Sequence, residues 1–282
     1  LPGQPPSLSG VAPFTKGDGT TRQFNKQAGY DSDELINYEL GIKSEFLDHH
    51  LVLNASAYWM KWSNIQLSLF DPVHLGNTTF DVNGPTYRVK GLEFQFTARL
   101  FEGLSLEGST SINVAEQTDA PCLRSNRAKP GNPTPLGQCI TQVNSLPYTN
   151  PYGVVGTRPP FSPPWMFNVR LRYDWSMSGD YRPFAWVGTS HIGPESNEPA
   201  SFPDGNSPSQ ANPTTTLLRY QIPGYTTYDA AVGVAKDAWT AQLTGSNLGN
   251  AYGPMNLSSG QFIKSEIPLR PRVLMFMIGY KF

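Results

Sequence analysis

The residues best suited to acid–base or metal chemistry in this chain are its four histidines, His49, His50, His74 and His191. His49 and His50 share one expected tight turn, in which their side chains point apart. Ser190 precedes His191 in an expected strand, and neighbouring strand residues face opposite sides of a sheet, which is poor geometry for a nucleophile and its base. The chain also lacks the glycine patterns of nucleotide-binding loops. We therefore expect no enzyme, no cofactor and no metal site.

A second group of residues has the chemistry of ligand binding and falls in one long connection, 118–164. The candidate ligand-binding residues are Arg124, Arg127, Lys129, Tyr148, Tyr152 and Arg158. Arginine and lysine form charge-assisted hydrogen bonds to anions, and tyrosine adds a flat apolar ring with a polar tip. Anionic ligands or glycans would suit this mixture. The alternative is a solvated, variable surface loop.

The same stretch holds both cysteines of the chain, Cys122 and Cys139. We expect a local disulfide between them, formed in an oxidising compartment. Closing a loop of this length stabilises a fold by about 3 kcal/mol in the chain-entropy description. The alternative is a pair of unrelated thiols, and no nearby histidine supports a zinc site.

Composition limits the kind of fold that positions these residues. Charged residues make up 15% of the chain and its formal net charge is −1, so it has no basic field to attract nucleic acid. The longest apolar run, 273–278, is far shorter than the ~18 residues of a transmembrane helix. Residue 1 is Leu and no signal peptide is visible, so we expect a mature or truncated product.

Alternation of apolar and polar residues is the main structural signal. Phe167, Val169 and Leu171, for example, alternate with Asn168 and Arg170. This pattern recurs and predicts about nine strands, several of them longer than the ~5–6 residues usual in globular proteins. The expected strands are 34–47, 51–70, 79–101, 104–117, 165–177, 181–193, 224–236, 239–249 and 269–282.

The connections between these strands alternate in length. Short turns are expected at 48–50, 102–103, 178–180 and 236–238, and long connections at 71–78, 118–164, 194–223 and 250–268. Outer-membrane barrels have short periplasmic turns on one side and long extracellular loops on the other. A soluble sandwich has no reason to sort its loops in this way.

Aromatic residues lie near both ends of the expected strands, as in the two ring girdles of a membrane barrel. Beside the short turns are Phe46, Phe101, Trp175, Tyr181, Trp239, Tyr280 and Phe282. Beside the long connections are Trp59, Trp62, Tyr87, Trp165, Phe167 and Tyr225. The other strand face is expected to be polar and to face a wet lumen, with Glu39, Lys43, Glu45, Glu93, Arg99, Glu107, Arg170, Arg172 and Asp174.

The fold class is therefore predicted to be all-β, an antiparallel transmembrane β-barrel segment of about nine long strands. Residues 1–33 are expected to form an extracellular loop or a partial strand, and residues 34–282 the barrel portion. About nine strands cannot enclose a lumen wide enough for a plug, because wide plugged barrels have about 22 strands. Partner strands are therefore expected from outside this chain.

Four stretches of sequence resemble the C-terminal part of the barrel of TonB-dependent outer-membrane receptors. They are Asn37-Tyr38-Glu39-Leu40-Gly41-Ile42-Lys43 with Leu53 to Trp59; Val89-Lys90-Gly91-Leu92-Glu93-Phe94 with Gly103 to Leu106; Pro223 to Asp229 with Asn247 to Tyr252; and Arg270-Pro271-Arg272 with Gly279-Tyr280-Lys281-Phe282. Their order and spacing, rather than any one of them, carry the resemblance.

The resemblance implies a protein of the Gram-negative outer membrane that takes up scarce ligands such as ferric siderophores, cobalamin or glycans. It implies as partners the outer-membrane lipid, the N-terminal barrel strands and plug that this chain lacks, and the TonB complex acting through that plug. It also implies that Phe282, with Tyr280, marks the last strand for the barrel-assembly machinery. The alternatives are an autotransporter-like or porin-like barrel and, with less support, an outer-membrane hydrolase.

Overall fold

The computed structural model describes residues 14–15, 21–22, 30–70, 79–119, 155–197, 220–258 and 265–281. Every regular element in these ranges is a strand. No helix in this part of the chain is long and apolar enough to cross a membrane.

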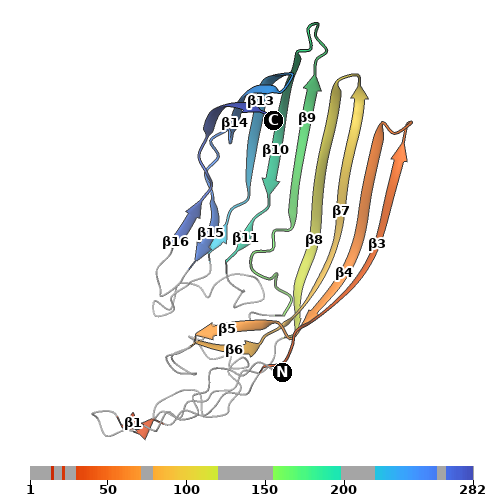
Figure 1. Cartoon of the computed structure of the whole chain (residues 1–282). Coiled ribbons are helices and arrows are strands. Elements are labelled where there is room, and N and C mark those ends of the chain that lie inside the picture. The colour runs from red at the N-terminus through yellow and green to blue at the C-terminus, as the bar shows by residue number, and fades with distance from the viewer. Residues whose placement is uncertain are drawn as a thin grey trace.

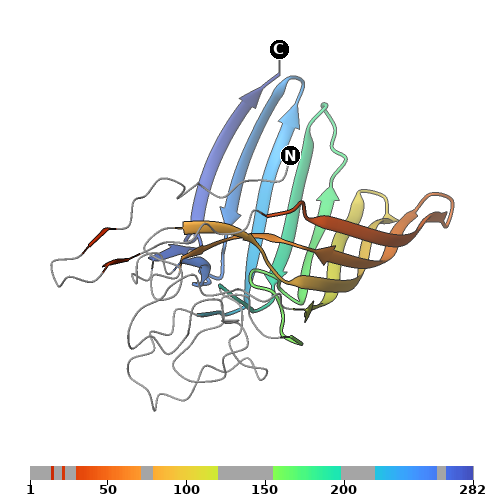
Figure 2. The ribbon, with the colours of Figure 1, turned by 90° about the horizontal axis from the view of Figure 1, so that it is seen from below.

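Nine long strands form one antiparallel sheet, in which each strand pairs with the next long strand along the chain. They are β3 (Glu34–Phe46), β4 (Leu51–Ser63), β7 (Thr86–Phe101), β8 (Leu104–Asp119), β9 (Trp165–Asp174), β10 (Arg182–Ile192), β13 (Tyr225–Lys236), β14 (Trp239–Ser246) and β17 (Val273–Tyr280). The sheet bends into a trough whose edge strands are β3 and β17 (Figures 1 and 2). This confirms the predicted barrel segment of about nine long strands.

Four short two-stranded sheets accompany the trough. They pair β1 (Phe14–Thr15) with β2 (Thr21–Arg22), β5 (Gln66–Phe70) with β6 (Thr79–Asn83), β11 (Glu195–Ser196) with β12 (Gln221–Ile222), and β15 (Pro254–Ser258) with β16 (Ser265–Pro268). The last three lie in long connections, at the lower end of the sheet in Figure 1. β11, β12, β15 and β16 fall in the predicted connections 194–223 and 250–268, which therefore carry strand structure that the sequence did not predict, whereas β5 and β6 fall within predicted strands.

Two of the predicted strands were wrong in extent, because 51–70 and 79–101 are each divided. Asn64 has a left-handed φ of 55° and separates β4 from β5. Gly84 and Pro85 separate β6 from β7, and proline has no N–H to give to the ladder. The side chain of Asn83 donates to the carbonyl of Asn64 at 2.9 Å, which ties the two breaks together.

Short hairpins close the upper end of the sheet, as predicted from the turn positions. Leu47, Asp48 and His49 have left-handed φ values of 57°, 52° and 66° in the turn between β3 and β4. Gly103, between β7 and β8, has a φ of 81°, and a Cβ there would lie 2.3 Å from the carbonyl oxygen of Asp174. Only glycine fits that turn without displacing the neighbouring hairpin.

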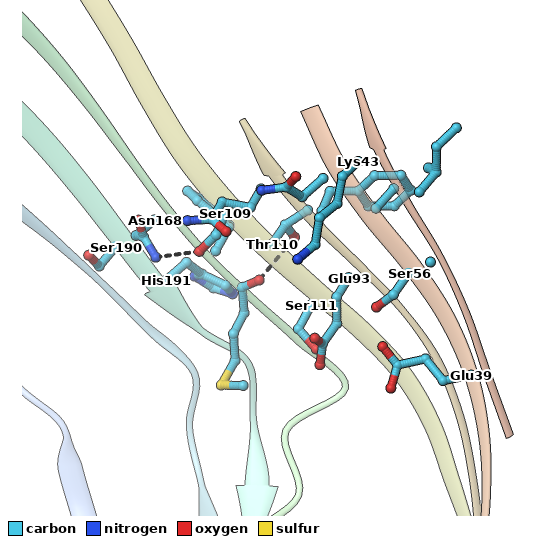
Figure 3. A pocket seen from close by; sticks show the side chains of 18 of the residues that line it. Glu39, Lys43, Ser56, Glu93, Ser109, Thr110, Ser111, Asn168, Ser190 and His191 are labelled. Carbon is cyan, nitrogen blue, oxygen red and sulfur yellow. Dashed lines mark hydrogen bonds between the residues drawn. The ribbon is translucent and has the colours of Figure 1, made fainter. Parts of the chain in front are cut away.

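The register places polar and apolar residues on opposite faces of the trough. Lys43 pairs with Asn54, Asn54 with Gln95, and Gln95 with Ser109, so these polar residues share one face. The next residues along the same strands, such as Ile42 and Phe94, point the other way. The polar face is the concave one, where it lines a hollow (Figure 3).

The convex face is apolar and uncovered. Leu40 is 79% exposed, Leu274 is 67% exposed and Ile278 is 65% exposed. A water-soluble sheet would pack such a face against another layer. Exposure of whole rows of large apolar side chains matches a face whose solvent is lipid.

A small packed core lies where the long connections leave the sheet. It includes Ile65, Pro85, Tyr87, Ala115 and Gln117, all buried. This core belongs to the strand extensions beyond the apolar band and not to the trough itself. It fixes the start of β7 and the end of β8, where these strands meet the long connections.

Candidate functional site: the concave face

A hollow of about 890 Å³ lies on the concave face, lined by β3, β4, β7, β8, β9 and β10 (Figure 3). Most of the side chains aimed into it are hydroxyls and amides. They include Asn54, Ser56, Gln95, Ser109, Ser111, Asn168 and Ser190. The alternation of each strand places these groups there, because every second residue faces inward.

Neutral hydrogen bonding dominates the chemistry of this hollow. The side-chain amide of Asn168 donates to the hydroxyl of Ser109 at 2.7 Å, across two neighbouring strands. Its charged lining consists of Glu39, Glu93 and Lys43, two carboxylates against one ammonium, which gives a formal charge of −1. Such a wall can hydrogen-bond water, polar protein surface or a hydroxylated ligand, and its net negative charge does not favour an anion.

A charged cluster follows on the same face, nearer the short turns. Arg170 pairs with Glu107 at 3.1 Å, and Arg172 makes two hydrogen bonds of 2.8 and 2.7 Å to Asp174. The guanidinium of Arg172 also lies 4.4 Å from the ring centre of Phe184. All four charged side chains face inward as predicted and are about half exposed, so each pair stabilises the fold only weakly.

The serine and histidine that adjoin in sequence do not meet. Ser190 pairs with Asn168 in the inward row, whereas the ring of His191 has the opposite parity and stacks at 5.5 Å on Phe167. Nδ1 of His191 lies 2.9 Å from the hydroxyl of Thr226. The two side chains therefore point to opposite faces of the sheet, as the alternation predicted.

The two turn histidines also have separate partners. His49 bonds through Nδ1 to the carboxylate of Glu45, and Nδ1 of His50 lies 2.8 Å from the carbonyl of Leu47. His74 lies outside the described residues. Within the ranges that the structure describes, no group of three or more His, Cys, Asp or Glu residues could hold a metal ion.

Arg158 is the one predicted ligand-binding residue whose place the structure describes. Its guanidinium donates to the side chain of Asn113 at 2.7 Å, to the carbonyl of Asn113 at 2.8 Å and to the carbonyl of Ser162 at 3.2 Å. Partial burial lowers the pKa of Arg158 from its usual value. These contacts anchor residues 155–164 to β8, and contact with a ligand stays a prediction.

The other predicted loop residues lie outside the described part of the chain. They are Arg124, Arg127, Lys129, Tyr148 and Tyr152, together with the cysteines Cys122 and Cys139. Phe282 also lies outside it. The proposed disulfide, the loop site and the terminal assembly signal therefore stay predictions.

Rings gather on the convex face near both ends of the sheet. Trp239 and Tyr280 lie 4.8 Å apart, and Tyr173 and Trp175 lie 4.7 Å apart, beside the short turns. At the other end are the pairs Tyr38–Trp59, at 5.7 Å, and Trp165–Phe167, at 5.0 Å. Tyr280, the second predicted assembly residue, therefore belongs to the ring band beside the short turns.

The predicted girdle beside the long connections was wrong in part. Trp62 pairs with Tyr87 and Tyr87 with Gln117, and this row has the inward parity of Gln95 and Ser109. Tyr225 likewise pairs with Ile192, on the side of Ser190. These three rings face the concave side, where Tyr87 is only 7% exposed. Their position near the long connections was predicted correctly. Counting strand parity in the sequence would also have predicted that they face the concave side.

Comparison with known proteins decides the family. The family model described as TonB-dependent receptor-like β-barrel matches residues 4–248. This chain belongs to that family. Members of the family are outer-membrane transporters of Gram-negative bacteria rather than enzymes, which agrees with the expectation from the histidines. The match favours a receptor barrel over the autotransporter-like, porin-like and hydrolase alternatives.

Solved structures share the fold of this receptor-like barrel at low sequence identity. The ferric yersiniabactin uptake receptor FyuA of Yersinia pestis matches with a TM-score of 0.60 and 15% identity, over 93% of this chain and 33% of the receptor. The FrpB iron transporter of Neisseria meningitidis matches with 0.57 and 15%, over 91% and 32%. The ferripyoverdine receptor of Pseudomonas aeruginosa matches with 0.56 and 16%, over 92% and 30%.

The receptor-like chain thus spans about a third of the length of these three structures. The search of curated protein sequences gave no match.

Proposed function

We propose that this chain forms part of the barrel wall of a receptor that takes up a scarce ligand across the outer membrane. The observation that carries the proposal is the two-faced sheet, with exposed apolar rows on its convex side and a polar hollow on its concave side. The family adds support, because its members are transporters. In this reading the concave face borders the lumen and the convex face contacts lipid.

The proposed ligand classes are ferric siderophores, cobalamin and glycans. The similar solved structures include receptors for ferric yersiniabactin and ferripyoverdine, which supports the first class. The hollow itself, with a formal charge of −1 and many hydroxyls and amides, favours contact with neutral polar groups. An anionic chelate would be bound first by the cationic loop residues Arg124, Arg127, Lys129 and Arg158.

The proposed partners follow from the edges of the sheet. Among the described residues, β3 and β17 each have a partner strand on one side only. Unpaired backbone cannot stay exposed at membrane depth, so strands from the rest of the receptor must cover both edges. The TonB complex, acting through a plug, and the barrel-assembly machinery, recognising Phe282 and Tyr280, complete the proposed set.

Uptake in the source bacterium tests this function. We expect deletion of the gene to abolish energised uptake of one labelled ligand class, among ferric siderophores, cobalamin and oligosaccharides, during growth under limitation for it. The gene in its natural full length should restore uptake, and a protonophore should stop it. Unchanged uptake of all three classes in the deletion strain would contradict the proposal.

A further inference from the structure

Three cations lie together on the convex face, at the end where the long connections begin. Lys61 on β4 is the direct partner of Arg88 on β7, and Lys90 follows on the same face of β7. Trp59 is the direct partner of Lys90 and completes the square. Partners on neighbouring strands are about 5 Å apart, and same-face neighbours along a strand about 7 Å. We call these four residues the convex basic patch.

The patch sits at the outer boundary of the apolar band. Towards the short turns, the outward residues Leu40 and Ile42 of β3 are apolar. Tyr38 packs on Trp59 with ring centres 5.7 Å apart. From Ile36, the direct partner of Lys61, to Phe46, a ring beside the short turn, the strand runs about 33 Å at ~3.3 Å per residue. At a strand tilt of roughly 40°, this length spans an apolar band of about 25 Å. The patch therefore lies at the depth of lipid headgroups.

Two of the three cations have no ion pair or hydrogen bond with the residues that the structure describes. Arg88 forms an ion pair with Glu116 on β8. Lys61 and Lys90 are exposed, and within the described ranges neither has an ion pair or hydrogen bond from its ammonium group. Glu34, at the start of β3, is another carboxylate on the convex face, and among the described residues it forms no ion pair with Lys61. The patch keeps a net positive charge against the membrane.

We propose that the convex basic patch binds phosphate groups of a lipid in the outer leaflet, where the acyl chains rest on Trp59 and the apolar rows below. Lys61 and Lys90 approach the phosphate from two strands, and Arg88 adds donors while it stays paired with Glu116. Charge complementarity identifies the occupant, because two free ammonium groups at headgroup depth attract anionic headgroups. The inference rests on the outer-membrane location and is independent of the transported ligand.

Lipid binding by the full-length receptor in detergent tests the site. The probe is diphosphorylated lipid A, titrated by native mass spectrometry beside its dephosphorylated form. We expect the wild type to prefer the phosphorylated form. We expect Lys61→Gln and Lys90→Gln to weaken its binding about fivefold each, and the double variant about 25-fold. Each lysine is expected to contribute the attraction of one cation near an anionic membrane surface.

Lys236→Gln is the matched control. Lys236 is also on the convex face but lies beside the short turns, where its ammonium group is 4.3 Å from the ring centre of Tyr181. We expect this variant to bind lipid A within about twofold of the wild type, since a single surface side chain far from the site contributes little. Heat-modifiable migration should be the same for all variants, which shows that each is folded.

Three results would overturn the proposal. One is a folded double variant that binds diphosphorylated lipid A as tightly as the wild type. Another is equal binding of the phosphorylated and dephosphorylated probes. The third is displacement of lipid A by inorganic phosphate at equal concentration, which would assign the site to the free anion rather than to lipid. Loss of transport in any variant has no bearing on these outcomes.

Discussion

The convex and concave faces of this sheet are made by the same strands and differ in almost every chemical property. On β7, Phe94 has outward parity and is exposed, whereas its neighbour Gln95 lies in the inward row of Asn54 and Ser109. The backbone conformation of the two residues is the same, so the difference lies in the solvent that each side chain meets. The comparison teaches that alternation records two environments, lipid outside and a wet polar lumen inside.

A charge placed on each face gives the largest expected contrast. Phe94→Arg puts a guanidinium in the apolar band and should lower the free energy of unfolding by about 2–4 kcal/mol. Gln95→Arg, one residue along, should change it by less than about 0.5 kcal/mol, because the lumen is wet. Denaturant titration of the receptor in lipid bilayers measures both. Equal losses would break the comparison between the faces.

The concave face tolerates substitution less well where an aromatic ring covers a glycine. A Cβ on Gly233 would lie 2.5 Å from the ring of Phe184 and 2.8 Å from the carbonyl oxygen of Ala241. Gly233→Val should therefore cost about 1–3 kcal/mol through overpacking. Gly279→Val on β17 is the control, because a Cβ there meets nothing within 4 Å. Denaturant titration should give Gly233→Val a clearly lower free energy of unfolding than Gly279→Val.

Charged pairs on the concave face should matter little for stability. Arg172 bonds Asp174 and lies over Phe184, yet both charged side chains are partly exposed. We expect Arg172→Gln to lower the free energy of unfolding by about 0.5 kcal/mol, less at high salt. A loss above about 2 kcal/mol, a size known for buried pairs, would show that this face is dry.

The smallest expected effect is a change in the pKa of one tyrosine, Tyr252, at the outer rim of the sheet, where both faces meet water. The hydroxyl of Tyr252 donates to the carboxylate of Glu266 at 2.6 Å, and this hydrogen bond raises the pKa of the tyrosine. The bonded neutral phenol persists below the ordinary pKa of about 10, and the bond is lost as pH rises through the raised value. Ultraviolet difference spectra should show Tyr252 ionising at lower pH in Glu266→Gln. An unchanged titration would place the two side chains apart.

Sequence alone predicted the strands, the alternating turns and the polar face, because a period of two residues is set locally by the backbone. It did not predict the breaks at Asn64 and Gly84, which depend on a left-handed residue and on a contact between two segments. It placed the rings of Trp62 and Tyr87 at the correct end but on the wrong face. Distance from a loop says nothing about direction unless strand parity is counted.

The site was harder to predict than the fold. Ligand contact by Arg158 stays a prediction, and the sequence did not predict its bonds to Ser162 and to Asn113, which is 45 residues away. No local pattern encodes such a long-range partner. The neutral row that includes Asn168 and Ser109 was also missed, because the sequence argument followed charges and neglected hydroxyls and amides.

Lipid contact along one strand tests the central claim most directly. Single cysteines replacing residues 92–97 of β7, labelled with a fluorophore in the reconstituted receptor, would be quenched in turn by brominated lipid and by a water-soluble quencher. The account predicts alternation, with lipid quenching at Leu92, Phe94 and Phe96 and aqueous quenching at Glu93, Gln95 and Thr97. Quenching that does not alternate, or that alternates with the opposite parity, would contradict it.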